Sequence, residues 1–519
     1  MPHTATGVRL AELIAALSLS SDLALGQPME HVLRASLIAQ RTGDRLGVDD
    51  NTRADAYWVT LLATVCTGES FEMVRAFGDD IAFRSGMYHV GPSQFATMFH
   101  ALGRAGSDRS PLARAGVVAG IIGGGGRAIE SVFTGHSAVT TAVSQRLDLG
   151  PGVTSALPKT FARWDGKGIP RGVGGEDVPM PVRLMMLADM AEVHHRVSGV
   201  DGAVAMAQRH SGKMLAPAVV RAFCGSAGEI LADLEDPWDR AIAAQPGALR
   251  PLDDGEVDTV LEVMADIADL KSPWFSSHSR GVADLASRAV ASAGMPAGDV
   301  VTVRRAGLLH DVGRTAIANS VWDKPGPLTD GERDRMRLHA YYTERMLRRP
   351  ALLAGLAAVA ASHHERLDGS GYHRGVRGAE IPLLGRYIGA ADVYHAVQEE
   401  RPYRAAMSEK QAVMHMRGEV HDGRLDAAAA EAVLGVAGHR TTLNVSAPAG
   451  LTAREVEVLV LIARGATTQQ VARQLAITPK TAGNHIERIY SKIGASSRST
   501  ATLFAMQHGM LATLEPVQR

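Results

Sequence analysis

The chain has 519 residues, of which 46% are hydrophobic and 21% are charged, and its formal net charge is -1. This composition is typical of globular domains, and the length predicts about three or four of them. The near-neutral balance excludes a chain that binds nucleic acid through overall positive charge, so any such binding requires a local basic patch.

Two cysteines, Cys66 and Cys224, exclude a disulfide framework and a cysteine-rich zinc site, and they are typical of a reducing cytoplasm. Glu12 and Asp22 interrupt the apolar stretch near the N-terminus, which argues against a signal peptide. No run approaches the roughly 18 uncharged apolar residues that a membrane span needs. Helical periodicity is common and strand-forming runs are scarce, so we expect a mainly α protein of the cytoplasm without a membrane partner.

A long-range repeat organises the first 437 residues. The segments that start at Trp164 and Leu367, 203 residues apart, share the pattern x-D-G-x-G-x-x-R-G-V-x-G, followed by a Pro, an Arg and an apolar helix. Upstream the offset becomes 247 residues and pairs His31 with His278, which places a 44-residue insertion (247 − 203) in the first half. We therefore expect two tandem, related helical domains over residues 1–247 and 255–437, a linker over 438–449 and a small C-terminal domain over 450–519.

The insertion contains a run of four glycines, residues 123–126. The run lacks the Lys-Ser/Thr pair that a phosphate-binding loop requires. We expect a flexible turn there rather than a nucleotide site.

Imidazole and carboxylate groups gather at the ends of apolar helical segments in the second domain. His310 and Asp311 follow the run AGLL, and His363 and His364 follow AAVAAS. Buried polar pairs are costly unless they are paired or bind a metal. Neutral imidazoles with carboxylates can surround a divalent cation. With the single residues that flank these pairs, the candidate ligands are His278, His310, Asp311, His339, His363, His364 and Asp392.

Five motifs over residues 275–435 now carry a specific resemblance: LLHDVG, KPGPLT, ASHHERLDGSGY, IPLLGRYIGAADVY and RPYR. In this order and spacing they resemble the HD-GYP phosphodiesterases of the HD superfamily. The resemblance implies a helical fold in which all seven candidate residues bind metal and Asp311 bridges two ions. A mixed His and carboxylate set favours iron or manganese over structural zinc. The two ions would activate water for attack on a phosphodiester.

The family's typical substrate is cyclic di-GMP or a related cyclic dinucleotide. The resemblance implies that four residues face its phosphates and guanines: Lys324, Tyr372, Arg401 and Arg404. Arginine suits bidentate phosphate contact. For Arg401 and Arg404, a salt bridge at a helix start is an equally good interpretation.

Three positions depart from the family pattern. His373 replaces the proline of the GYP triplet, Arg314 replaces the usual lysine after the His-Asp pair, and Trp274 stands where three-metal members carry glutamate. Trp274 favours two metals over three. Arg314 stays protonated, so it cannot act as a general acid but can stabilise charge on phosphate, and with Asp311 it is a candidate catalytic residue.

The first domain retains few of these ligands. The matching positions are His31, Ala63, Thr64, His136, Thr160, Phe161 and Asp189, so only three of seven ligand types remain. We expect this domain to be catalytically inactive. The adjacent His194 and His195 have no partners at family positions, and a solvated helix face is the better interpretation.

Residues 451–511 predict a helix-turn-helix. Thr452 and Glu455 form a capping box, Gly465 ends the first helix, a second runs from Thr468 to Leu475, and Pro479 begins a third that reaches about Ile493. The motifs LT-x-RE-x-EVL, T-x-x-T and H-I-x-x-I-Y-x-K-I resemble the LuxR-type DNA-binding domain. The segment from Leu451 carries eight basic and four acidic residues, a local excess of +4.

In such a motif the recognition helix enters the major groove of double-stranded DNA, and two half-sites require a dimer. We expect base contacts from Lys480, Thr481, Asn484, His485 and Arg488, and phosphate contacts from Lys492 and Arg498. The leading hypothesis is a homodimeric regulator whose HD-GYP domain hydrolyses a cyclic dinucleotide. The alternatives are an inactive nucleotide-sensing transcription factor and a phosphohydrolase of another nucleotide.

Overall fold

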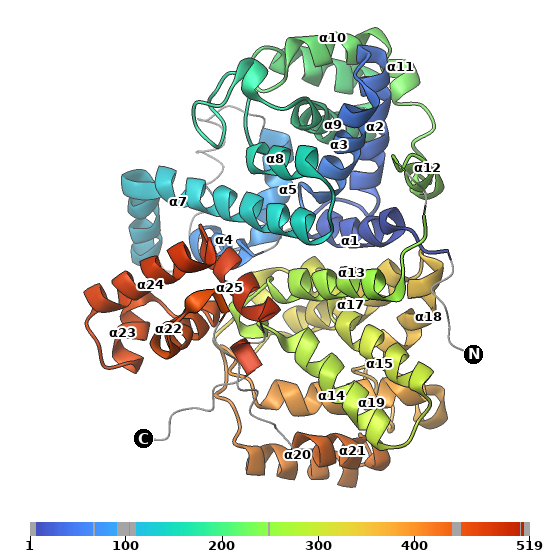
Figure 1. Ribbon diagram of the computed structural model, residues 1–519, viewed down its shortest axis with the longest axis vertical. Coiled ribbons are helices and arrows are strands. Elements are labelled where there is room, and N and C mark those ends of the chain that lie inside the picture. The colour runs from blue at the N-terminus through green and yellow to red at the C-terminus, as the bar shows by residue number, and fades with distance from the viewer. Residues whose placement is uncertain are drawn as a thin grey trace. The chain divides into compact units, whose positions relative to one another are not determined.

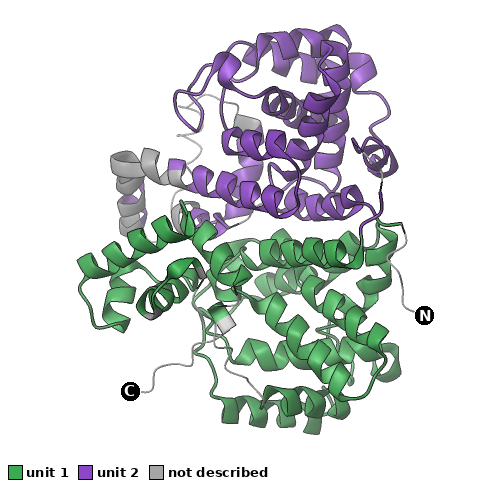
Figure 2. Cartoon of the chain, in the orientation of Figure 1, with its two compact units in different colours: residues 1–8, 253–519 green, residues 9–252 purple. Residues whose placement is uncertain are grey.

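A computed structural model describes residues 7–65, 68–90, 103, 111–247, 250–438, 448–508 and 510–512 (Figure 1). These residues form helices and no strand, so the predicted mainly α class is confirmed. The chain divides into two compact units, residues 9–252 and residues 253–519 with residues 1–8 (Figure 2). Among the described helices, none combines the length and the apolar character that a membrane crossing needs. Cys66 lies outside the described residues.

The unit of residues 9–252 is built around three helices. α2 packs against both α3 and α9, and α3 packs against α9. Its described α-helices are α1 (Leu10–Ala24), α2 (His31–Leu46), α3 (Asp50–Leu62), α4 (Ser70–Phe77), α5 (Asp80–Val90), α7 (Pro111–Arg146), α8 (Pro151–Ala156), α9 (Met180–His210), α10 (Pro217–Gly225), α11 (Ala227–Ile230) and α12 (Trp238–Ala243).

The prediction of a flexible turn at the glycine run was wrong. Residues 123–126 lie inside α7, not in a turn. Each glycine in a helix costs about 1 kcal/mol relative to alanine, but a break would also forfeit backbone hydrogen bonds on either side. α7 therefore continues on both sides of the run.

The second unit contains a similar triplet, in which α14 packs against α15 and α19 and α15 packs against α19. Asp253 caps α13, with its side chain accepting from the Glu256 amide at 2.8 Å, a contact worth about 1 kcal/mol. The α-helices that precede residue 438 are α13 (Asp254–Asp269), α14 (His278–Ser292), α15 (Ala297–Leu309), α16 (Asn319–Trp322), α17 (Asp330–Leu347), α18 (Ala351–Ala360), α19 (Leu383–Val397), α20 (Glu409–His421) and α21 (Ala427–Ala437).

Local geometry recurs between the two units at the offsets found in the sequence. At an offset of 247, α2 and α14 both follow a residue with positive φ, Glu30 (71°) and Ser277 (65°). At the same offset, Asp22 accepts from the Val32 amide at 3.0 Å and Asp269 accepts from the Ser279 amide at 2.9 Å. These recurrences support the predicted duplication, which stays a prediction.

The described residues of the C-terminal part form the α-helices α22 (Ala453–Ala463), α23 (Thr468–Gln474), α24 (Pro479–Ile493) and α25 (Arg498–Gln507). The predicted capping box is present, because Thr452 accepts from the Glu455 amide and Glu455 accepts from the Thr452 amide. Pro479 is the first residue of α24, and Ala482 and Ile489 bury its inner face. The predicted helix-turn-helix is confirmed. The predicted linker lies almost wholly outside the described residues.

Candidate metal centre

The fold brings all seven predicted ligands to one buried place, although they come from five separate segments of the chain. His278 begins α14, His310 and Asp311 follow α15, His339 lies in α17, His363 and His364 follow α18, and Asp392 lies in α19. Six of these residues are at most 3% exposed, and only the His364 side chain reaches 18%.

Asp311 lies at the middle of the cluster, and its two oxygens face different histidines. Its Oδ2 atom is 2.7 Å from Nε2 of His310 and 3.5 Å from Nε2 of His278. Its Oδ1 atom is 3.3 Å from Nε2 of His339 and 3.5 Å from Nε2 of His363. One ligand group is therefore His278, His310, Asp311 and Asp392, and a second is His339, His363 and His364.

The outer nitrogens of three imidazoles are held by their own helices. His310, His339 and His363 each donate Nδ1–H to the carbonyl three residues earlier, at 2.7, 2.5 and 2.7 Å. This hydrogen bond places the proton on Nδ1 and leaves the Nε2 lone pair for the centre. Metal-binding histidines are typically oriented in this way.

The donor set fits divalent cations. Nε2 of His310 and both oxygens of Asp311 are buried and form no well-aligned hydrogen bond among the described residues. Burial lowers the pKa of His339 to about 3, so that imidazole is neutral and free to bind a metal. Burial alone would raise the pKa of Asp311, but its contacts outweigh burial, with the charge of Arg314 first among them, and hold this pKa well below its usual value.

Arg314 is buried beside this carboxylate. Its Nη2 atom contacts Asp311, and its guanidinium carbon lies 4.2 Å from the centre of the Phe275 ring. Its Nε and Nη1 atoms are buried and form no hydrogen bond among the described residues. Such donors are costly to leave unpaired and are suited to an anionic ligand.

The comparisons with known proteins agree with this geometry. Residues 262–429 match the model of the HD domain, and residues 449–505 match that of the bacterial regulatory proteins of the luxR family. The 3′3′-cGAMP-specific phosphodiesterase 3 of Vibrio cholerae is 30% identical over 422 residues, which are 79% of this chain and 91% of that protein.

The chain belongs to the HD-GYP phosphodiesterase family.

Two further matches extend this result. The crystal structure of a V. cholerae cyclic GMP-AMP-specific phosphodiesterase (V-cGAP3) superposes with a TM-score of 0.58 and 26% identity, covering 83% of this chain and 98% of that one. A cyclic di-GMP phosphodiesterase of Thermotoga maritima is 36% identical over 148 residues, 28% of this chain and 40% of that protein. The predicted phosphodiesterase class, HD domain and LuxR-type domain are thereby confirmed.

The HD-GYP loop after the two adjacent histidines is held by carboxylates that the sequence reasoning missed. Glu365 is 5% exposed and accepts from the amides of Arg374 and Val376 at 2.8 and 3.1 Å. His373, which stands at the position of the family's proline, contacts Glu344 at 3.0 Å through Nε2. Glu365 directly follows the histidine pair, so its position was a usable signal. Nothing in the sequence near His373 pointed to Glu344.

The predicted substrate-binding residues differ in their surroundings. Tyr372 lies beside the centre, with its ring centroid 4.6 Å from that of His364. Lys324 is paired with Glu332 at 2.5 Å. Arg401 contacts Glu399 at 2.6 Å, and Arg404 donates to the carbonyls of Ala396 and Val397. Both arginines have structural partners, but these are not the predicted salt bridges at a helix start, because Arg404 bonds carbonyls at the end of α19. A substrate role for all four residues stays a prediction.

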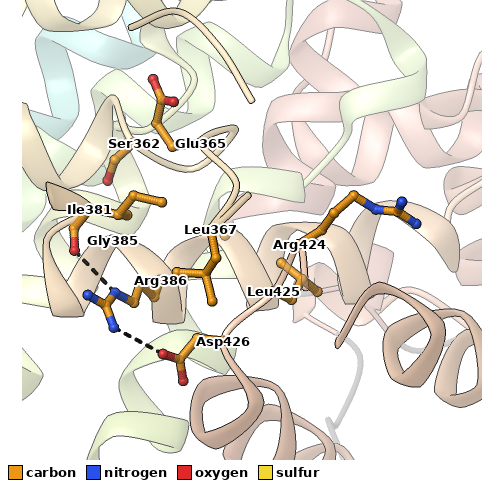
Figure 3. A pocket seen from close by; sticks show the side chains of 10 residues that line it. Ser362, Glu365, Leu367, Ile381, Gly385, Arg386, Arg424, Leu425 and Asp426 are labelled. Atoms are coloured by element: carbon orange, nitrogen blue, oxygen red, sulfur yellow. Dashed lines mark hydrogen bonds and ion pairs between the residues drawn. The ribbon is translucent and has the colours of Figure 1, made fainter. Parts of the chain in front are cut away.

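A pocket is lined in part by Ser362 and Glu365, the residues on either side of the histidine pair in the sequence (Figure 3). Its charged groups are engaged within the protein: Arg386 contacts Asp426 at 3.1 Å, and Arg424 contacts Glu419 at 2.7 Å. None of the seven predicted ligands lines it. The pocket is lined by Ser362, Glu365, Leu367, Ile381, Gly385, Arg386, Gly389, Arg424, Leu425 and Asp426.

The counterpart positions of residues 9–252 are engaged in protein contacts. His31 bonds Asp189 at 2.9 Å and Glu192 at 2.5 Å. Burial alone would lower the pKa of His31, but these two carboxylates raise it to about 10, so the imidazole is charged and offers no lone pair. His136 uses both nitrogens on protein groups, the Glu69 carboxylate at 3.0 Å and the Ala63 carbonyl at 2.6 Å.

Within the described part of this unit, the remaining counterpart positions belong to no group of potential metal ligands. Phe161 packs edge-on against the His136 ring, and Thr160 donates to the Leu157 carbonyl. Thr64 has a buried hydroxyl. His194 and His195 are half-buried on α9, and neither belongs to a group of potential ligands among the described residues.

The recognition helix α24 presents most of its predicted base contacts. Lys480, Thr481, Asn484 and Arg488 are exposed, and His485 is half-buried. The two predicted phosphate contacts are engaged within the protein. Lys492 donates to Glu455 at 2.7 Å and to the Gly450 carbonyl at 3.0 Å, and Arg498 donates to the carbonyls of Gly465 and Ala466 at 3.3 and 3.2 Å. All seven roles in DNA binding stay predictions.

Proposed function

We propose that the metal centre hydrolyses a 3′3′-linked cyclic dinucleotide and that the LuxR-type domain binds double-stranded DNA. The placement of Asp311 carries the catalytic part. One of its oxygens faces His278 and His310, and the other faces His339 and His363, all within 3.5 Å. A carboxylate shared by two ligand groups is the arrangement that a pair of divalent cations requires.

We assign two ions, iron or manganese, to these groups. The imidazole-rich set favours such metals over magnesium or calcium, which prefer oxygen ligands. Bound ions would lower the pKa of a water molecule and withdraw charge from the phosphoryl oxygens. Trp274 offers no ligand at the position where a third metal would need a carboxylate.

Arg314 serves the phosphate in this proposal. Its contact with Asp311 fixes the guanidinium, and its unpaired Nε and Nη1 atoms supply N–H donors for a non-bridging phosphoryl oxygen. Tyr372 contributes an aromatic face beside His364. Binding of the dinucleotide by the remaining predicted residues, Lys324, Arg401 and Arg404, requires each side chain to leave the protein group that it now contacts.

The relative that matches over most of both chains is 3′3′-cGAMP-specific, which favours 3′3′-cGAMP over cyclic di-GMP as the substrate. The same relatives do not favour an inactive sensor or a phosphohydrolase of another nucleotide. We further propose that residues 9–252 are a degenerate, non-catalytic copy of the HD-GYP domain. His31 and His136 support this, because carboxylates occupy their ring nitrogens in place of a metal. The chain acts in the cytoplasm as a homodimer, so that two recognition helices read two half-sites.

The test is turnover by the metal-loaded full chain, with 3′3′-cGAMP and cyclic di-GMP offered separately and together. The proposal expects linear dinucleotide from 3′3′-cGAMP at the higher kcat/KM, and none from a His310→Ala variant. Full metal occupancy with both substrates intact would contradict it. Gel-shift titration against the chain's own promoter region tests the DNA-binding part independently.

A further inference from the structure

His278 is held differently from the other buried ligands. His310, His339 and His363 donate their outer Nδ1–H to backbone carbonyls of the preceding turn. His278 is the first residue of α14 and has no preceding turn of that helix to supply a carbonyl. Its Nδ1 atom instead lies 2.9 Å from Oε2 of Glu399, while its Nε2 atom lies 3.1 Å from Oδ1 of Asp392.

Glu399 has a second neighbour at Oε2 and a further one near Oε1. Oε2 also accepts from Nη2 of Arg401 at 2.6 Å, and Oε1 lies 3.1 Å from Nδ1 of His395, one turn earlier on the same segment. The Glu399 side chain is only 17% exposed. An ionised carboxylate in this position strengthens the hydrogen bond from the imidazole and increases its basicity toward a metal.

His395 occupies space that only a glycine provides. A Cβ atom added to Gly281 would lie 1.9 Å from Nε2 of His395 and 2.6 Å from two of its ring carbons. Any larger residue at position 281 would displace this imidazole and with it a partner of Glu399. Gly281, His395 and Glu399 are therefore a matched set.

In residues 9–252, the histidine paired with His278 is His31, and it also has a carboxylate at Nδ1, which comes from a different position. The offsets of 247 and 203 residues pair Gly281 with Arg34, His395 with Glu192 and Glu399 with Arg196. Glu192 accepts from Nδ1 of His31 at 2.5 Å, and its other oxygen contacts Arg34 at 2.6 Å and Arg196 at 3.4 Å. The residue type differs at each of the three paired positions. A carboxylate nevertheless lies against Nδ1 of the histidine in both units.

We propose that Glu399 is a positioning residue of the metal centre, which fixes the proton of His278 on Nδ1 and directs Nε2 at the cation shared with His310, Asp311 and Asp392. Arg401 holds Glu399 in place through a hydrogen bond, and His395 lies beside the other oxygen of Glu399. The inference deepens the proposed function and rests on it, because it assigns the outer support of one ligand group. Moving the carboxylate from position 399 to position 395 should still support His278, because the carboxylate that supports His31 stands at Glu192, the position paired with His395.

The experiment titrates Mn²⁺ into the metal-stripped full chain by calorimetry. The variants are Glu399→Gln, the relocation variant His395→Glu with Glu399→Gln, and the matched control Glu400→Gln, whose carboxylate is exposed. We expect two ions per chain in the wild type and the control. Glu399→Gln should weaken one of the two sites about 10- to 100-fold, and the relocation variant should regain most of that loss.

Wild-type manganese affinity at both sites in Glu399→Gln would overturn the inference, and so would a folded relocation variant that binds as weakly as the single variant. A third manganese ion that Glu399→Gln abolishes would overturn it too, since His278, His395 and Glu399 would then be ligands themselves. Melting curves establish folding, and if Glu399→Gln does not fold the relocation variant decides alone. A wild-type chain that binds no manganese would instead overturn the proposed metal centre, and the inference with it.

Discussion

Replacing Asp311 by asparagine removes a group that both halves of the metal centre share. Oδ2 of Asp311 faces His278 and His310, and Oδ1 faces His339 and His363. Asparagine has a single carbonyl oxygen, and its amide nitrogen donates hydrogen bonds but does not bind these metals. At most one ligand group can therefore keep an oxygen from this position. Manganese bound per chain should fall from two ions to one or none.

The Asp311→Asn substitution should also lower kcat, because it removes a carboxylate that both ligand groups share. Removal of one preorganised charge-stabilising group typically costs about 10²- to 10³-fold in kcat, and Asp311→Asn removes a charge from both groups at once. We expect a loss of at least about 10³-fold, equivalent to ~4 kcal/mol of barrier. Atomic absorption after dialysis counts the metal, and chromatography of linear dinucleotide gives kcat.

The control variant carries the same substitution at an aspartate outside the metal centre. Asp284→Asn removes a carboxylate that is 64% exposed on α14 and should change neither quantity. Two manganese ions bound to Asp311→Asn with wild-type affinity would refute the bridging role of this carboxylate.

Arg314→Gln should lower kcat about 10²- to 10³-fold while two manganese ions stay bound, since its spare donors serve the phosphate, and loss of the metal instead would contradict that role. Asn484→Ala with Arg488→Ala should weaken promoter binding by about 1–3 kcal/mol per lost base contact, measured by gel shift, and unchanged affinity with unchanged salt dependence would disprove base reading by α24. Burial raises the pKa of Asp22 from 3.8 to about 7, so its ionised form is disfavoured in the folded chain and the contribution of Asp22 to wild-type stability should fall as the pH rises from about 4 to 7. Asparagine at Asp22 does not titrate, so the stability of that variant relative to the wild type should rise by up to ~4 kcal/mol over this range, and a pH-independent difference in melting would refute the assignment.

The helix boundaries of the C-terminal domain were predictable from local signals. Thr452, Glu455 and Pro479 mark helix starts through their own hydrogen-bonding and φ preferences, and the structure places α22 and α24 accordingly. The glycine run of residues 123–126 misled the same reasoning, because helix continuation across α7 depends on the flanking segments rather than on the run itself.

The ligand cluster was predictable because its members stand in short motifs with fixed order. The residues that orient the cluster were not, since their partners are distant in the chain. Glu399 meets His278 across 121 residues, and the role of Gly281 emerges only from the ring of His395 beside it. Lys492 and Arg498 show the same limit, because basic character alone does not reveal that Glu455 and nearby carbonyls already engage them.

The proposed function requires the buried cluster around Asp311 to be a hydrolytic two-metal centre for a cyclic dinucleotide. The most direct measurement incubates the manganese-loaded full chain with 3′3′-cGAMP in ¹⁸O-labelled water and follows the products by mass spectrometry. Such a centre should produce linear dinucleotide that carries ¹⁸O on its new terminal phosphate, and the Asp311→Asn variant should give no product. Intact 3′3′-cGAMP in the presence of a fully metal-loaded, folded wild-type chain would contradict it.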